Sequence, residues 1–313
     1  MAGRLMLLDT ASLYFRAFYG VPDTVKAPDG TPVNAVRGLL DMIGRLVTDF
    51  EPTSVVACWD DAWRPQWRTA LIPSYKLHRV AEEVPGGVDV EETPPALVQQ
   101  IPLIREVLQA FGIPIVGAHD HEADDVIGTL ATRSNDPVDV ITGDRDLFQL
   151  ADDERGVRIV YTARGMSRLE LVTDEVVRSK YGVGAAQYVD FAVLRGDTSD
   201  GLPGVAGVGE KTAATLVRDF GSVEAIVAAA ADRSTPMSAS LRAKISAASD
   251  YLAVAPRVVE VVRDLPFDDA AIASSGLLEP VTPQQRSEIE RLAKQWGLGG
   301  SVDRALRALP AAE

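Results

Sequence analysis

Hydrophobic and polar positions in the first half of the chain alternate between short apolar runs and longer stretches of helical spacing. The short runs are typical of buried strands, and the spacing of Val, Leu and Ile in the longer stretches is typical of helices with one apolar face. This alternation indicates a mostly parallel sheet covered by helices on both faces. The predicted strands are residues 4–8, 54–59, 113–116 and 138–143, and the predicted helices are 33–50, 95–111 and 122–133.

The second half of the chain has a helical pattern with short loops. Thr173 is a suitable N-cap for the first of these helices, so we place a domain change near residue 182. An α/β domain is therefore predicted over 1–182 and a helical domain over 183–313. The predicted helices are 173–181, 185–195 and 210–220, followed by a C-terminal packing helix that starts with a capping box at Thr282 and ends near Gly297.

Residues 62–95 differ from both halves. Aromatic and basic residues come first, and an acidic run with glycines follows over 82–92. A long excursion from a compact sheet is usually functional or disordered. Within it, Lys76 and Arg79 are three residues apart and would share one face of a helix. They are either a solvated face or, opposite a cluster of carboxylates, a clamp for a phosphate group.

Carboxylates follow three of the predicted strands. Because parallel strands end at the same edge of a sheet, Asp9, Asp60 and Asp144 should lie close together. Each alone is typical of a helix cap. Two ionised carboxylates about 4 Å apart would repel each other by about 4 kcal/mol. A cluster of them is therefore stable only if cations bind, if some carboxylates are protonated or if they lie farther apart. Further carboxylates join them in sequence clusters: Glu122, Asp124, Asp125, Asp146, Asp197 and Asp200.

Oxygen ligands favour Mg²⁺ or Mn²⁺ over zinc, and the chain has only 3 His and 1 Cys to offer zinc. Many carboxylates at one edge suit two ions roughly 3.5–4 Å apart, the arrangement that activates water in phosphodiester hydrolysis.

A glycine-rich turn over 204–209 precedes Lys211 at the start of a helix. The turn lacks the spacing of a Walker A loop, and it is either a plain helix connection or a phosphate-binding hairpin that grips DNA without reading its sequence.

Composition adds weak limits. The chain of 313 residues has 46% hydrophobic and 24% charged residues, as expected of a globular protein of about two domains. A single Cys58 cannot form an intramolecular disulfide, and the apolar run before Asp9 is too short for a signal peptide or a membrane span. We therefore expect a cytoplasmic monomer that makes no membrane contact. The net charge of −14 argues against nucleic acid only weakly, because bound cations would offset part of it.

These motifs, in this order, resemble those of the bacterial 5′-nuclease family, which includes the N-terminal domain of DNA polymerase I and stand-alone flap endonucleases. No polymerase region follows, so the resemblance is to a stand-alone member. The segments that carry it are Leu7-Leu8-Asp9, 14–18, Trp59-Asp60 with Arg68 and Tyr75-Lys76-x-x-Arg79, 122–125, 142–147 and 196–213.

The resemblance implies a PIN-like nuclease core with a helical arch over about 62–95, and a helix-three-turn-helix over about 186–222. It implies a structure-specific 5′-3′ exonuclease and 5′-flap endonuclease of replication and repair. Its substrates would be flaps, nicks and RNA–DNA primers, and its cofactors two or more Mg²⁺ or Mn²⁺ ions, with K⁺ at the turn. Lys76 and Arg79 would be catalytic, and the metal carboxylates would be Asp9, Asp60, Glu122, Asp124, Asp125, Asp144, Asp146, Asp197 and Asp200. DNA would contact Arg16, Arg68, Tyr75, Gly204, Gly207, Gly209, Lys211 and Thr212.

Two other functions stay open at this level. A phosphatase with Asp9 as nucleophile would leave Asp197, Asp200 and the glycine turn without a role, and Ala11 stands where its second aspartate is usual. A catalytically silent DNA binder would not need the full carboxylate set. Cleavage of a flap with and without Mn²⁺ separates these alternatives.

Overall fold

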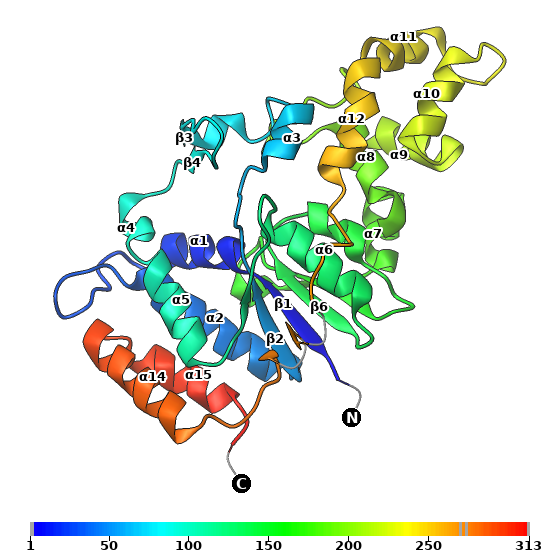
Figure 1. Ribbon diagram of the computed structural model, residues 1–313. Coiled ribbons are helices and arrows are strands. Elements are labelled where there is room, and N and C mark those ends of the chain that lie inside the picture. The colour runs from blue at the N-terminus through cyan, green and yellow to red at the C-terminus, as the bar shows by residue number, and fades with distance from the viewer. Residues whose placement is uncertain (1–2, 269–270, 273–274, 312–313) are drawn as a thin grey trace.

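The computed structural model describes residues 3–268, 271–272 and 275–311. Its centre is a six-stranded sheet in the order β5-β2-β1-β6-β7-β8, in which β8 alone among these strands pairs antiparallel (Figure 1). The predicted parallel sheet is therefore confirmed, and β7 and β8 extend it beyond the strands predicted from the sequence. The strands are β1 (Leu5–Asp9), β2 (Ser54–Cys58), β5 (Ile115–Val116), β6 (Val138–Thr142), β7 (Val157–Tyr161) and β8 (Glu170–Val172).

Helices cover both faces of this sheet. Alternate residues of β1 serve opposite faces, because successive strand side chains point in opposite directions. Met6 and Leu8 belong to the core with α1, α2 and α5, whereas Leu7 belongs to the core with α6. The helices of these layers are α1 (Thr10–Gly20), α2 (Asn34–Phe50), α5 (Ile101–Ala110) and α6 (Ala123–Arg133), and the loops also contain the 3-10 turns η2 (Asp146–Leu150) and η3 (Met166–Arg168).

A helical region follows the sheet and lies beside it, at the upper right of Figure 1. Thr173 caps α7 as predicted, since its side chain accepts the Val176 N–H. The buried residues of this region share one continuous core with Leu7 and α6, so the two parts pack tightly. Its elements are α7 (Asp174–Tyr181), η4 (Ala185–Gln187), α8 (Tyr188–Arg195), α9 (Glu210–Phe220), α10 (Val223–Ala231), α11 (Ala239–Ala247) and α12 (Ser249–Val259).

The last two helices return to the α/β core rather than extending the helical region. α14 (Pro283–Trp296) and α15 (Gly299–Ala308) lie against α5 and α2 (Figure 1). The predicted capping box at Thr282 and the helix end at Gly297 are both confirmed. No helix among the residues that the structure describes is long and apolar enough to cross a membrane.

The excursion over 62–95 contains less helix than the term helical arch implies. A short helix, α3 (Gln66–Leu71), leads to a 3-10 turn, η1 (Leu77–Arg79), and to a hairpin of β3 (Val80–Glu82) and β4 (Val90–Glu91). The acidic run therefore forms the hairpin and its loop. A second short helix, α4 (Pro95–Val98), precedes α5, where a single helix was predicted.

Candidate active site

A pocket of about 300 Å³ opens at the carboxyl edge of β1, β2 and β6. Asp9 ends β1, Asp60 lies two residues beyond β2, and Asp144 lies two residues beyond β6, so the sheet brings together the three carboxylates expected there. The helical region adds a fourth through the loop that follows α8. The charged residues lining the pocket are Asp9, Asp60, Lys76, Arg79, Glu91, Glu122, Asp124, Asp144, Arg145 and Asp197.

Asp9 caps α1 from the end of β1. Its side chain accepts hydrogen bonds from the Ser12 N–H at 3.1 Å and from the Thr142 hydroxyl at 2.6 Å. Burial, together with the neighbouring charges of Asp60 and Asp144, nevertheless raises the pKa of Asp9 to about 7. Its charged form is therefore unfavourable without a cation.

The same effect extends across the cluster. Burial is the main cause that raises the pKa of Asp60, Asp124 and Asp146, and repulsion from neighbouring carboxylates adds to it. The pKa of Asp200 rises to about 6 for the same reason, opposed by the positive charge of Lys76. One oxygen of Asp146, Oδ1, is buried without a hydrogen-bond partner.

Oxygen donors of this kind fit a hard divalent cation by their chemistry, because buried carboxylates that repel one another gain most from a positive ion. Within the described ranges, however, no three or more His, Cys, Asp or Glu side chains are arranged so that they could hold a metal ion as they stand. Asp9, Asp60, Glu122, Asp124 and Asp144 face the pocket, whereas Asp146 and Asp200 lie behind its lining.

The segment carrying Lys76 and Arg79 is fastened to the loop after α8. The Lys76 N–H donates to the Asp200 carbonyl at 2.9 Å, and the Ser74 hydroxyl donates to the Gly201 carbonyl at 2.9 Å. Arg79 donates to the Ser199 carbonyl at 2.8 Å and to Asp200 Oδ1 at 3.1 Å. Both cations line the pocket, although the sequence alone allowed them to be a solvated face.

Glu122 organises a buried part of this wall. Its Oε2 is ion-paired with the Lys76 ammonium, and its Oε1 accepts from the Tyr75 hydroxyl at 2.7 Å and from Arg68 at 2.9 Å. Burial is the largest effect on Lys76 and lowers its pKa, but Glu122, Tyr75, Asp200 and Asp124 together outweigh it, so the pKa is raised well above its ordinary value. Lys76 therefore stays charged beside the pocket.

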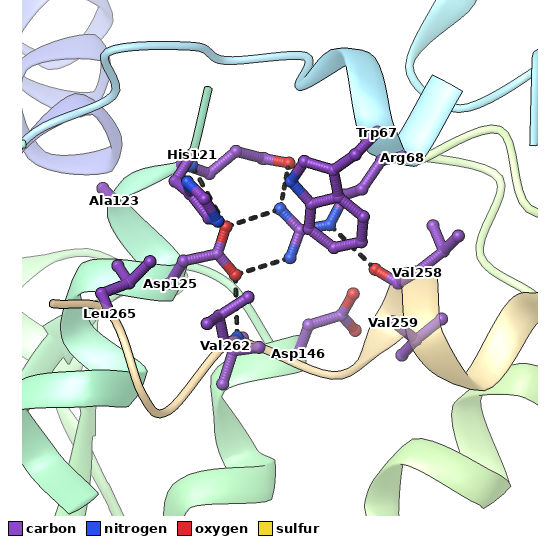
Figure 2. Close-up of polar contacts among 12 residues, drawn as sticks. Trp67, Arg68, His121, Ala123, Asp125, Asp146, Val258, Val259, Val262 and Leu265 are labelled. Carbon is purple, nitrogen blue, oxygen red and sulfur yellow. Dashed lines mark hydrogen bonds and ion pairs between the residues drawn. The ribbon is translucent and has the colours of Figure 1, made fainter. Parts of the chain in front are cut away.

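Three predicted site residues lie in the interior instead. The Arg68 and Asp125 side chains are bound to each other, with 2% and 0% of their surfaces exposed, and Tyr75 is 5% exposed (Figure 2). Arg68 and Tyr75, which were expected to contact DNA, are both buried here, and DNA contact at these two positions stays a prediction. Asp125 does not line the pocket, and its carboxylate balances Arg68 rather than facing a metal ion.

The loop after α8 holds Asp197 at the pocket and Asp200 against Arg79. Asp197 accepts from the Ser199 N–H at 2.9 Å and is ion-paired with Arg195 at 3.2 Å and Arg145 at 3.5 Å. The loop closes on itself, since the Asp197 N–H donates to the Leu202 carbonyl and the Leu202 N–H donates back. Asp197 therefore reaches the pocket from the helical region on a fixed backbone.

The glycine turn leads into α9, which Gly209 caps. Gly204 has a φ of +64°, and a Cβ there would lie 2.5 Å from the Gly196 nitrogen, so only glycine allows this close backbone approach. Lys211 is exposed in the first turn of α9, and Thr212 is half-buried beside it. Lys244 of α11 donates to the Gly207 carbonyl at 2.9 Å, so an ammonium group already contacts the turn at which K⁺ is expected.

Arg16 of α1 does not line this pocket. It lines a cavity of about 800 Å³ between α1 and α2, and its Nη1 donates to the Ala163 carbonyl at 3.5 Å.

Sequence reasoning missed Glu91 and Arg145 as pocket residues. Arg145 could have been found from its place between Asp144 and Asp146, but Glu91 reaches the pocket only through the hairpin register.

A carboxylate pocket at the edge of a parallel sheet, lined also by Lys76, Arg79 and Arg145 and with a helical region packed against it, is the arrangement expected of a divalent-metal-dependent nuclease. The family model for the 5′-3′ exonuclease N-terminal resolvase-like domain matches residues 4–182, and the model for the 5′-3′ exonuclease C-terminal SAM fold matches 183–275. The chain belongs to the 5′-3′ exonuclease family.

Similar proteins agree with this membership. A 5′-3′ exonuclease of Streptomyces coelicolor is 56% identical over 98% of this chain and 100% of its own length. DNA polymerase I of Mycobacterium tuberculosis is 43% identical over 71% of this chain and 24% of its own length. A solved structure of the T5 D15 flap endonuclease with DNA and metal ions has the same fold, with a TM-score of 0.63 and 18% identity over 93% of this chain and 100% of that one.

Proposed function

We propose that this protein is a structure-specific 5′-nuclease that acts as a 5′-3′ exonuclease and 5′-flap endonuclease on DNA during replication and repair. The observation that carries the proposal is the pocket itself. Carboxylates from the sheet and from the helical region meet there beside Lys76 and Arg79. The names of similar proteins support the same activity, since a close relative is called a 5′-3′ exonuclease.

Mg²⁺ or Mn²⁺ is the proposed cofactor, held by Asp9, Asp60, Glu122, Asp124 and Asp144, with Asp197 approaching from the helical region and Asp146 and Asp200 in support. When bound, such ions supply an activated water and stabilise the leaving oxygen. The carboxylates fit this role because burial and mutual repulsion make their charges unfavourable without cations.

Lys76 and Arg79 bind the scissile phosphate in this proposal. Both side chains line the pocket opposite the sheet edge, and each is anchored by an acidic partner that keeps it in place. A positive charge held at this point gains most when negative charge develops on the phosphate in the transition state. Their contribution should therefore appear in the rate of cleavage more than in affinity.

The glycine turn and Lys211 bind the duplex part of the substrate. Backbone N–H groups at the start of α9, the exposed Lys211 and the positive end of the helix all favour a phosphate. Such contacts do not depend on sequence, so the enzyme selects the shape of DNA. Branched or 5′-ended duplexes are the proposed partners.

Cleavage of matched oligonucleotides tests this function. A 5′ flap, a 3′ flap and an intact duplex of the same sequence are incubated with the protein in Mg²⁺, Mn²⁺ or EDTA. The proposal predicts cleavage of the 5′ flap in either metal and none in EDTA, with the 3′ flap and the duplex interior left intact. Equal cleavage of all three, or release of phosphate from a small phosphate ester instead, would refute it.

A further inference from the structure

Arg68 is the most deeply buried cation of the structure's described part and makes contacts in three directions. Its Nη1 and Nη2 donate to the two oxygens of Asp125 at 2.8 and 2.7 Å, Nη1 also donates to Glu122 Oε1 at 2.9 Å, and Nε donates to the Val258 carbonyl at 3.0 Å (Figure 2). The guanidinium lies over the Trp67 ring, 4.4 Å from its centroid. Four of its five N–H donors are therefore taken by protein groups.

These contacts join three segments that are far apart in sequence. Arg68 lies on α3 at the base of the excursion over 62–95, the carboxylates lie at the start of α6, and Val258 lies in the last turn of α12. Asp125 Oδ1 also accepts the Val262 N–H at 2.9 Å, just beyond α12. The pair thus ties the end of the helical region to the α/β core.

A second contact holds the same stretch of chain. Gln149 on η2 donates to the Val259 carbonyl at 3.1 Å and accepts the Val261 N–H at 3.0 Å. The turn η2 begins at Asp146, and α6 follows Glu122. The chain leaving α12 is therefore attached to α6 and to η2, and each of these elements carries an acidic residue of the site.

The position of Glu122 depends on Arg68 more directly. Two of its three side-chain partners, Arg68 and Tyr75, share Oε1, which leaves Oε2 for Lys76. Without the guanidinium the carboxylate could turn toward Lys76 with both oxygens. Lys76 would then be drawn from the pocket that it lines together with Glu122.

We infer that Arg68 is a positioning residue for the cleavage reaction. It sets the orientation of Glu122 and, through it, of Lys76, while fixing the end of α12 against the start of α6. This inference rests on the proposed nuclease function and deepens it, because it assigns a role to a residue that touches neither substrate nor metal. The geometry requires a planar group with donors on three sides, which an ammonium cannot supply.

Arg68→Lys and Arg68→Met test the inference against Arg158→Met. Arg158 donates to the buried Asp139 at 2.6 and 3.2 Å near the opposite, amino end of β6, so its loss also removes an arginine from a buried carboxylate. Three quantities are measured for each variant: the thermal unfolding temperature, the Kd for flap DNA in EDTA, and the single-turnover rate at saturating DNA and metal.

The inference predicts that both Arg68 variants bind DNA within about threefold of the wild type and cleave at least tenfold more slowly at saturation. Arg158→Met should lose stability but keep its cleavage rate within about twofold. Should neither Arg68 variant fold, Asp125→Asn and its control Asp139→Asn take their places with the same measurements and the same expectations.

Folded Arg68 variants that cleave within twofold of the wild type would overturn the inference, as would a loss confined to affinity. An equal loss of rate in the Arg158→Met control would also overturn it, because the effect would then be general destabilisation. A wild-type protein that cleaves no flap would instead refute the proposed function, so the two failures are distinct.

Discussion

Removing the charge of Asp9 should stabilise the metal-free protein while it abolishes cleavage. The pKa of Asp9 is about 7 against an ordinary value of 3.8, chiefly because of burial. That difference corresponds to a cost of about 4 kcal/mol for the ionised side chain in the folded protein. Asp9→Asn keeps the cap on α1, since asparagine caps helices as well as aspartate. It weakens the hydrogen bond with Thr142, at about 1 kcal/mol, so the expected net gain is about 3 kcal/mol at pH 8.

The gain should depend on pH with a definite sign. A carboxylate whose pKa is raised by folding destabilises the protein above that pKa, and the penalty disappears as the pH falls toward the unfolded value. The stability difference between Asp9→Asn and the wild type should therefore be full above pH 7 and shrink between pH 7 and about pH 4. Urea unfolding in EDTA at pH 8 measures the full difference, and the same measurement at pH 5 should give a clearly smaller one.

Asp139→Asn is the matched control, because Asp139 is also a fully buried carboxylate. Arg4 and Arg158 neutralise it at 2.7 and 2.6 Å. The same substitution should here cost about 2 kcal/mol, less than for a fully buried pair because both arginines stay partly exposed. A loss of stability for Asp9→Asn in EDTA at pH 8, or an effect equal at pH 5 and pH 8, would refute the view that Asp9 is held in an unfavourable charged state. Added Mg²⁺ should stabilise the wild type more than Asp9→Asn.

Three further sets of substitutions test separate parts of the account. Lys76→Ala or Arg79→Ala should lower the single-turnover rate on flap DNA by about 100-fold while the Kd changes little, and a loss of affinity alone would make them substrate-binding residues only. Lys211→Ala should reduce the slope of log K for duplex binding against log salt concentration by about one unit for every sequence tested. An unchanged slope would show that this exposed side chain contacts no phosphate. Replacing the exposed Glu82, Glu83 and Glu92 of the hairpin with Gln should raise cleavage of long 5′ flaps relative to short ones, most at low salt, and an unchanged length profile would exclude repulsion of the flap.

The sequence predicted the sheet and its acidic edge because both follow from strong local patterns. Apolar runs such as the one before Asp9 have one stable environment, a strand buried on both faces. Once the strands are parallel, their carboxyl ends must meet, so Asp9, Asp60 and Asp144 converge without any knowledge of tertiary contacts. Of the missed strands, β7 lies between β6 and β8, and β8 is the edge strand, which pairs antiparallel and has only its last residue buried.

Side-chain direction was harder to predict. Glu122, Asp124 and Asp125 lie within one helical turn, so they point in different directions, and the sequence does not state which direction faces the pocket. In the structure Asp124 lines the pocket and Asp125 turns inward to Arg68. Arg68 and Tyr75 belong to a motif of the family, but a motif gives the importance of a residue and not its exposure. The hairpin over 80–91 depends on pairing between distant residues, which the glycines and charges of that segment conceal.

The most direct test of the central claim is the position and metal dependence of a single cut. Metal-stripped protein is mixed with a 5′ flap labelled at its 5′ end or at the 3′ end of the same strand, and Mg²⁺ or Mn²⁺ is then added under single-turnover conditions. The account predicts that cleavage starts only with the metal, that the 5′ label leaves on fragments cut near the flap junction, and that Asp9→Asn is inactive. Cleavage in EDTA, cleavage that proceeds from the 3′ end, or full activity of Asp9→Asn would contradict it.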